Sequence, residues 1–235
     1  MKKFILLLAL LFLNVSIAQD LNTFFSKANT FLSEYVKDGK VDYQSISDNQ
    51  SNLDELLTIA KSISVETSDT KNYQAFWINA YNLAVIKGII DNYPIQSPLD
   101  KQGFFDKIKY RLGGKDLTLN DIEHNLLRAN FKDPRFHFVL VCGAIGCPPL
   151  ISEAYTPDKL SAQLDRQTRK AINGSFLRIN HKKKRVEGSE ILKWYKEDFI
   201  LEGNEIDFIN KYLTNKIPTN YKLSYFSYNW NLNKL

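Results

Sequence analysis

The feature that most constrains this fold is a stretch at residues 73–90 that is apolar on almost every side of a helix. A surface helix keeps its apolar residues on one stripe, whereas a helix that is apolar all round is typical of a buried position. The stretch ends just before Tyr93-Pro94, and proline disfavours helical geometry at the residue before it. The sequence therefore predicts a buried central helix against which the other elements pack.

Two amides interrupt this apolar stretch, at Asn79 and Asn82. Together with Ile86 they follow one stripe of a helix, at positions i, i+3 and i+7. A buried amide without a hydrogen-bond partner costs about 1–3 kcal/mol, so both side chains need partners. Two roles are open: the amides tie neighbouring loop backbone to the core, or they form a pair that faces a ligand.

The rest of the chain combines helical segments with short strand pairs. Helices are predicted at residues 21–35, 53–63, 119–130, 157–172, 190–195 and 205–213. Hairpins are predicted for 108–112 with 115–119, and for 176–179 with 185–187. The strongest single strand is 136–141, and an aromatic strand is expected at 221–228. This pattern favours an α+β fold: a helix-rich single domain packed on a small, mainly antiparallel sheet with hairpins.

The first 18 residues are typical of a signal peptide. Two lysines precede an apolar run at residues 4–13, and Ser16 and Ala18 are small residues at the positions that a signal peptidase reads. The run is too short for a permanent span, which needs about 20 apolar residues. We expect a periplasmic or secreted protein, cleaved between Ala18 and Gln19, without a transmembrane span in the mature chain. The alternative is an uncleaved N-terminal anchor.

The mature chain, residues 19–235, is predicted to be one globular domain, because it has no internal repeat, low-complexity tract or linker. Its net charge is +3, two less than the +5 of the whole chain, since two lysines leave with the signal peptide. An even mixture of charges does not require a polyanionic partner, and export argues against nucleic acid. We expect an unknown small molecule or protein as the partner, and no cofactor.

Six segments, taken in order, resemble the motif series of a known family. They lie at residues 76–82, 122–124, 133–138, 142–149, 194–199 and 228–233. The series resembles that of the domain of unknown function 547 family, and the family-like region covers about residues 70–233. Two positions depart from the pattern, Gly146 where serine is expected and Asn229 where aspartate is expected. Because this family has no settled activity, the resemblance supplies candidate residues and no reaction.

His124 and His137 are candidate catalytic residues. His124 shares a helical stripe with Leu127, so we expect it to be at least half buried. His137 lies on the predicted strand at residues 136–141, on the face opposite Cys142, because side chains alternate along a strand. Each histidine is either a core residue held by hydrogen bonds or a general base, since histidine titrates near neutral pH.

Cys142 and Cys147, the only two cysteines, lie in a glycine-containing loop. In an oxidising compartment, cysteines this close are a candidate disulfide, which would contribute on the order of 2 kcal/mol because the closed loop is short. Three alternatives stay open: a nucleophilic thiol near a histidine, a zinc site with His124 and His137, and a redox pair. The spacing matches no standard zinc or redox motif, so we assign no metal site.

Arg128, Arg135 and Glu123 complete the set of candidate ligand-binding residues, with Asn79 and Asn82. Arginine suits carboxylate and phosphate ligands because its planar guanidinium donates two parallel hydrogen bonds. A ligand pocket is expected where these arginines, the histidines and the cysteine loop converge. The alternative is that both arginines form ion pairs with acids of the chain, namely Glu123, Asp121 or Asp198.

Two functions remain open from the sequence. The first is a binding or structural domain of the cell envelope that contains a Cys142–Cys147 loop. The second is a cysteine-dependent hydrolase or transferase, in which Cys142 or Cys147 acts with His124 or His137. Both cysteines follow both of these histidines in the chain, which is not the order found in papain-like enzymes.

Overall fold

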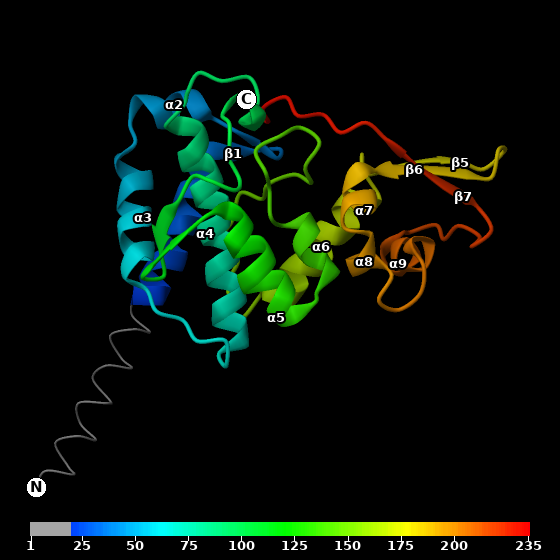
Figure 1. Ribbon diagram of the computed structural model, residues 1–235, viewed down its shortest axis with the longest axis horizontal. Coiled ribbons are helices and arrows are strands. Elements are labelled where there is room, and N and C mark those ends of the chain that lie inside the picture. Colours follow the sequence, from blue (N-terminus) through cyan, green and yellow to red (C-terminus); the bar gives the residue numbers. More distant parts are fainter. Residues whose placement is uncertain (1–19) are drawn as a thin grey trace, which may run out of the picture.

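Helix α4 (Thr70–Ile90) is the central element of the fold, as its apolar sequence predicts (Figure 1). Seventeen of its 21 residues are buried. The structure, a computed structural model, describes residues 20–235, so the predicted signal peptide and its cleavage site lie outside the described residues. One side of α4 is covered by helical residues 20–35, α2 (Tyr43–Asp48) and α3 (Ser51–Ser62).

The strands form small separate sheets. Three strand pairs are antiparallel, β1 (Val36–Lys37) with β2 (Lys40–Val41), β3 (Tyr110–Leu112) with β4 (Lys115–Leu117), and β5 (Leu177–Asn180) with β6 (Arg185–Ser189). The fourth pair, β6 with β7 (Lys222–Phe226), is parallel. Gly113 and Gly114 both have positive φ in the β3–β4 turn, a conformation that glycine adopts without strain. The prediction of a helix-rich α+β fold with hairpins is confirmed.

The remaining helices are short, except for α6. After α4, the chain forms η1 (Pro98–Asp100), η2 (Asp121–Arg128), α5 (Ala129–Phe131), η3 (Pro134–Phe138) and α6 (Leu160–Ile172). The last part contains α7 (Glu190–Trp194), α8 (Lys196–Phe199) and α9 (Glu205–Tyr212). Ser189 caps α7, as predicted, by accepting a hydrogen bond from the Ile191 amide. No helix within residues 20–235 has both the length and the apolar character needed to cross a membrane.

Helix η2 is a π-helix, where the sequence predicts an ordinary α-helix. The Ala129 amide donates to the carbonyl of His124, five residues earlier, instead of the usual four. π-Helical turns are rare, and many of those that are found lie at functional sites. Helix η2 carries Glu123, His124 and Arg128, three of the residues singled out in the sequence.

The prediction of a strand at residues 136–141 is wrong. Residues 134–138 form the 3₁₀-helix η3, which is capped by Asp133, whose side chain accepts a hydrogen bond from the Arg135 amide. The backbone that follows pairs with a side chain of α4: Asn82 donates to the Val139 carbonyl and accepts from the Val141 amide, both at 2.9 Å. A continuous apolar run is compatible with a buried strand and equally with another buried segment. Here the side-chain amide of Asn82 bonds to the backbone in place of a neighbouring strand, so the segment is buried without being a strand.

Buried side chains form two clusters, one around α4 and one beneath β5–β7 and α9. Cys147 packs against both clusters. The C-terminal tail, residues 228–235, runs from the second cluster back to the first (Figure 1). It pairs with the cysteine loop, because Ile145 and Gly146 donate backbone hydrogen bonds to the tail at 2.8 Å. That residues 19–235 form one domain stays a prediction.

Candidate functional site

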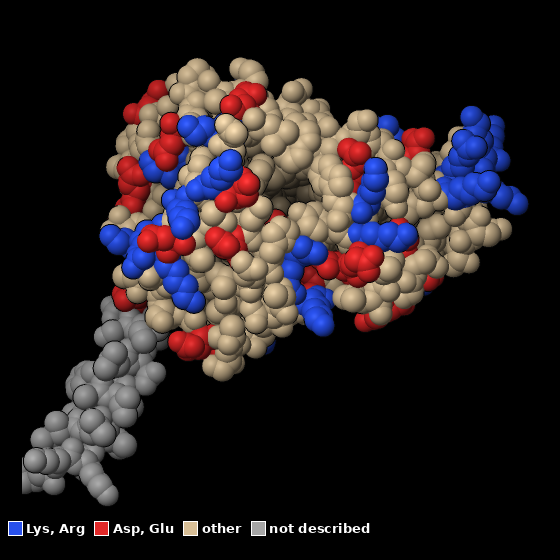
Figure 2. All heavy atoms as spheres, in the orientation of Figure 1, with Lys and Arg blue, Asp and Glu red and all other residues tan. Residues whose placement is uncertain are grey.

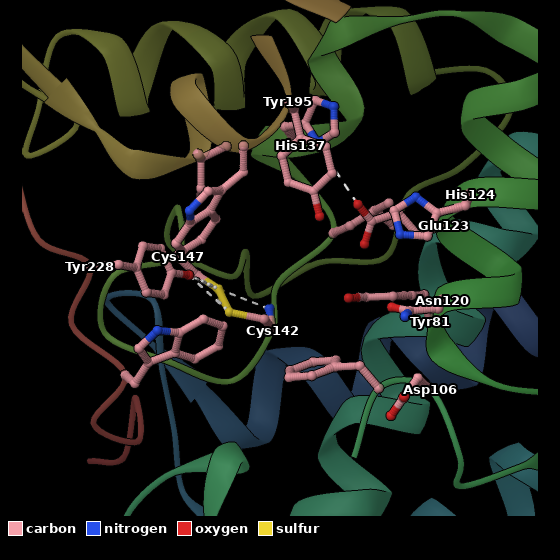
Figure 3. A pocket seen from close by; sticks show the side chains of 15 residues that line it. Tyr81, Asp106, Asn120, Glu123, His124, His137, Cys142, Cys147, Tyr195 and Tyr228 are labelled. Carbon is pink, nitrogen blue, oxygen red and sulfur yellow. Dashed lines mark hydrogen bonds and ion pairs between the residues drawn. A yellow bond between two sulfur atoms is a disulfide. The ribbon is translucent and has the colours of Figure 1, made fainter. Parts of the chain in front are cut away.

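A pocket opens between the two clusters, where Figure 2 shows a hollow in the surface. Helices α4 and η2 line one side, and α7 and the C-terminal tail line the other. Its volume is about 490 Å³, which lies within the range of small-molecule sites, roughly 300–1,000 Å³. In Figure 3, Glu123, His124, Asn120, Asp106 and Tyr81 lie across the pocket from Tyr228 and the two cysteines.

Glu123 is the buried acid of the pocket, with 8% of its surface exposed. Burial and the negative charge of Glu123 raise the pKa of Tyr81, Tyr195 and Tyr228 well above that of a free tyrosine. The hydroxyls of Tyr81 and Tyr195 also interact directly with the Glu123 carboxylate. All three tyrosines therefore stay protonated and present hydrogen-bond donors near neutral pH.

Four side chains form a chain of close contacts that runs from His124 and His137, in the pocket lining, to Arg128 and Asp198 behind it. Nε2 of His137 lies 2.6 Å from Oδ2 of Asp198, and Nε of Arg128 donates to the same oxygen at 2.7 Å. Nη1 of Arg128 lies 2.6 Å from Nδ1 of His124. Because arginine has only donors, Nδ1 of His124 must accept, so the proton of this neutral ring is on Nε2.

Asp198 is ionised in this arrangement. Burial acts to raise the pKa of its carboxyl group, but hydrogen bonds and charge from His137 and Arg128 outweigh burial and hold the pKa below its ordinary value. The ion pair predicted for Arg128 is thus present, and its partner is Asp198.

His137 is fixed on all sides and only 4% exposed. Tyr195 stacks on its ring with 4.0 Å between centroids, and the Arg128 guanidinium lies 4.7 Å from the centroid of the Tyr195 ring. The second nitrogen of His137, Nδ1, lies 4.0 Å from Oε1 of Glu123. Both ring nitrogens therefore face carboxylates, one behind the pocket and one inside it.

Cys142 and Cys147 are joined by a disulfide, and residues 20–235 contain no free cysteine. The hydroxyl of Tyr228 lies 2.9 Å from each sulfur, and it must be the donor because a bridged sulfur has no hydrogen. The Cys142 amide donates to Sγ of Cys147 at 2.9 Å. The loop requires glycine at Gly143, where φ is +80° and a Cβ atom would lie 2.5 Å from Cδ1 of Ile89.

An aromatic wall, formed by Trp194, Tyr228 and Trp230, faces the acid side of the pocket. The Tyr228 ring lies 4.7 Å from the Trp230 ring and 5.0 Å from the Trp194 ring, between centroids. The two tryptophans lie 5.9 Å apart at an angle of 24°. Trp194 is 44% exposed, so part of this wall is open to solvent.

The pocket is acidic although the chain is basic. Glu123 and Asp106 are among its lining residues, whereas no lysine or arginine among the described residues lines it. The whole chain has a net charge of +5. Arg128, the nearest cation in the chain of contacts, is committed to Asp198 and His124.

The structure brings five of the predicted candidates together in the pocket lining, Glu123, His124, His137, Cys142 and Cys147. The other four candidates do not line it. Asn79 bonds to the backbone of Ala75 and Tyr155, and Asn82 to that of Val139 and Val141. Arg128 lies behind the pocket, and Arg135 pairs elsewhere with Asp133 and Asp165. Residues 20–235 contain no group of three or more His, Cys, Asp or Glu placed to hold a metal ion.

Sequence reasoning did not select the aromatic wall, Tyr81, Tyr195, Asp106 or Asn120 as site residues. All of these aromatic residues lie inside motif segments of the family resemblance, which is the signal that marks them. Asp106 and Asn120 lie outside every such segment, so no sequence signal indicates them.

Comparison with known proteins gives one family. Residues 65–172 match the model of the family described as "Protein of unknown function, DUF547". The matched range contains Glu123, His124, His137 and both cysteines, whereas Asp198 and the aromatic wall follow it. No curated protein and no solved structure matches the chain. The family match assigns residues 65–172 to the DUF547 family, a family of unknown function.

Proposed function

We propose that this protein is an exported binding protein for a small organic cation, held between Glu123 and the aromatic wall. The observation that carries the proposal is the composition of the pocket lining. It combines two carboxylates and several aromatic rings with no lysine or arginine among the described residues, in a chain that is basic overall. A ligand with a positive charge and an apolar body complements such a lining.

The buried carboxylate of Glu123 supplies the electrostatic reason. A buried charge is costly unless a charge of opposite sign accompanies it. The nearest ring nitrogen, Nδ1 of His137, lies 4.0 Å away, and Arg128, which attracts Glu123 electrostatically, forms its ion pair with Asp198. A cationic ligand in the pocket would be the close counter-charge of Glu123.

The aromatic wall supplies the second contact. A cation near the face of a tryptophan or tyrosine ring is attracted by about 0.5–2 kcal/mol, depending on how far it is desolvated. Trp194, Tyr228 and Trp230 offer this contact across the pocket from Glu123. The two sides together favour an ammonium group with methyl or aromatic substituents.

Export is part of the proposal. The first 18 residues predict a signal peptide, and the Cys142–Cys147 bridge suits an oxidising compartment outside the cytoplasm. The mature chain of the proposed protein is residues 19–235.

The alternative, a cysteine-dependent hydrolase or transferase, gains no support from the site. A nucleophilic cysteine acts as a free thiolate, and both cysteines are bridged. The base would have to be His124 or His137. Both ring nitrogens of His137 face carboxylates, and His124 accepts from Arg128 through Nδ1.

Calorimetric titration of the mature chain with cations and their neutral isosteres tests the proposal. One pair is choline and 3,3-dimethyl-1-butanol, and the other is benzylamine and benzyl alcohol. We expect at least one cation to bind about tenfold or more tightly than its neutral partner, which corresponds to about 1.4 kcal/mol. Equal affinities within both pairs, or no binding of either cation, would contradict the proposal.

The matched variants are Glu123→Gln and Glu202→Gln. The first keeps the shape of the pocket and removes its buried charge, so the preference for the cation should fall to near unity. Glu202 is 76% exposed at the side chain and pairs with Lys211 outside this pocket, so its variant should bind like the wild type.

A further inference from the structure

We infer that the Cys142–Cys147 disulfide is a thiol-exchange site, at which a low-molecular-weight thiol attacks Cys142 and Cys147 leaves. Both cysteines line the pocket and are only partly buried, so their sulfurs border a cavity large enough for a small molecule (Figure 3). Access of the attacking thiolate is a requirement for exchange, and this cavity provides it.

The loop does not depend on the bridge alone for its shape. Ile145 and Gly146 donate backbone hydrogen bonds to the C-terminal tail, and the Asn233 amide donates to the Gly143 carbonyl at 3.0 Å. The loop is therefore held at both sides when the sulfur–sulfur bond opens. A bridge in such a loop can break and re-form without loss of the surrounding fold.

The hydrogen bonds at the two sulfurs are unequal. Sγ of Cys147 receives two donors, the Cys142 amide and the Tyr228 hydroxyl, each at 2.9 Å. In the described part of the chain, Sγ of Cys142 receives the Tyr228 hydroxyl alone. Donors stabilise a thiolate and make it the better leaving group, so the departing sulfur is that of Cys147.

The first step of the exchange needs only the protein disulfide and one small thiolate. The thiolate of the small thiol forms a bond to Sγ of Cys142, the Cys142–Cys147 bond breaks, and its electron pair remains on Sγ of Cys147 as a thiolate. This first step is redox-neutral overall. A second thiolate can then attack the small-molecule sulfur of the mixed disulfide, which releases a symmetric disulfide, reduces the protein by two electrons and leaves two cysteine thiols after protonation.

The charge of the lining selects among thiols, and this part of the inference rests on the proposed function. Glu123 and Asp106 favour a cationic aminothiol over an anionic mercapto acid. A neutral thiol tests the exchange chemistry independently of this preference.

The experiment treats the oxidised mature protein, in its native state and without oxygen, with 2-mercaptoethanol, cysteamine or 3-mercaptopropionate. Acid stops the reaction, iodoacetamide labels the free thiols, and tandem mass spectrometry of the peptide that contains both cysteines locates the adduct. Each rate is divided by the rate of the same thiol with a small model disulfide, which removes differences in intrinsic reactivity.

We expect the mixed disulfide on Cys142 and the alkyl label on Cys147 with the neutral thiol. Adducts mainly on Cys147, or an equal distribution, would overturn the assignment of the leaving sulfur. Exchange that occurs only after unfolding in denaturant would overturn the site itself.

Tyr228→Phe keeps the ring and removes the hydroxyl that donates to both sulfurs. The departing thiolate of Cys147 then keeps only the Cys142 amide as a donor, so exchange should slow about fivefold or more. The matched control is Tyr221→Phe, because Tyr221 bonds to His181 away from the pocket and should leave the rate unchanged. If Tyr228→Phe fails to fold, the position of the adduct on the wild-type protein still decides the inference.

The outcomes of the thiol and choline experiments distinguish a failure of the exchange site from a failure of the proposed cation binding. Exchange at Cys142 by the neutral thiol, without faster exchange by cysteamine, would support the exchange site and contradict the acidic selectivity. Choline binding without native exchange would support cation binding and overturn the exchange site.

Discussion

The carboxylate of Asp198 lies 2.6 Å from Nε2 of His137, although 61 positions separate these residues in the chain. His137 belongs to η3, and Asp198 belongs to α8 in the part that carries the aromatic wall. Arg128 of η2 bonds to the same carboxylate oxygen. Asp198 therefore ties the two sides of the pocket together, and the geometry of the site depends on it.

Replacement of Asp198 by Asn should destabilise the protein by about 2 kcal/mol near neutral pH, because charge-assisted hydrogen bonds to Arg128 and His137 are lost. Chemical unfolding measured with the wild type and the variant gives this difference. The control is Asp116→Asn, whose ion pair with Arg111 is exposed and should contribute less than about 1 kcal/mol.

The same variant predicts a pH dependence. The pKa of Asp198 is lower in the folded protein than in the unfolded chain, so its stabilisation is complete above about pH 5 and is lost as the pH falls further. The difference between wild type and Asp198→Asn should shrink between about pH 5 and pH 2. A difference that stays constant over this range would contradict the assigned pKa shift.

Asn82→Ala should cost about 2–3 kcal/mol, because it leaves the Val139 carbonyl and the Val141 amide buried without their partner. Asn72→Ala, in the same helix, is the control, since Asn72 bonds to Asp69 at an exposed position. Thermal or chemical unfolding checks both variants. Equal small losses of stability in the two variants would show that the segment after η3 does not depend on the side-chain amide of Asn82.

His124 should carry its proton on Nε2. The short contact from Arg128 to Nδ1 requires that nitrogen to accept. Two-dimensional ¹H–¹⁵N spectra of the imidazole side chains distinguish an unprotonated from a protonated ring nitrogen. A protonated Nδ1 in His124 near neutral pH would contradict the contact, and Arg128→Gln should redistribute the two tautomers.

Local patterns in the sequence are enough to predict the parts of the fold that depend on local physics. The all-round apolar character of residues 73–90 predicts the buried helix α4, and Gly113-Gly114 predicts the β3–β4 turn. Ser189 predicts the start of α7. In each case the residues that determine the structure are neighbours in the chain.

The errors arise where distant residues decide the local conformation. The segment at 136–141 is apolar enough for a strand, but Asn82 of α4 takes the hydrogen-bonding positions that a neighbouring strand would occupy. The π-helical geometry of η2 has no periodic signature in eight residues. Neither the absence of a strand at residues 136–141 nor the π-helical geometry of η2 can be predicted from the sequence of the segment concerned.

The residues of the candidate site were predictable in part, and its geometry was not. The family-like segments indicate Glu123, His124, His137 and the cysteines, which the pocket brings together. Asp198 was among the acids expected to pair with an arginine, and it does pair with Arg128. Its bond to His137 depends on the long-range arrangement of the fold, which spacing in the chain does not encode.

The proposed binding of an organic cation between Glu123 and the aromatic wall can be tested by nuclear Overhauser contacts between choline and the protein. We expect contacts from the trimethylammonium protons to the rings of Trp194, Tyr228 and Trp230, and none to Trp77, which is 2% exposed within the core. The contacts should disappear in Glu123→Gln and should be absent for 3,3-dimethyl-1-butanol at the same concentration. Contacts of equal strength from the neutral alcohol, or choline contacts confined to other surfaces, would contradict it.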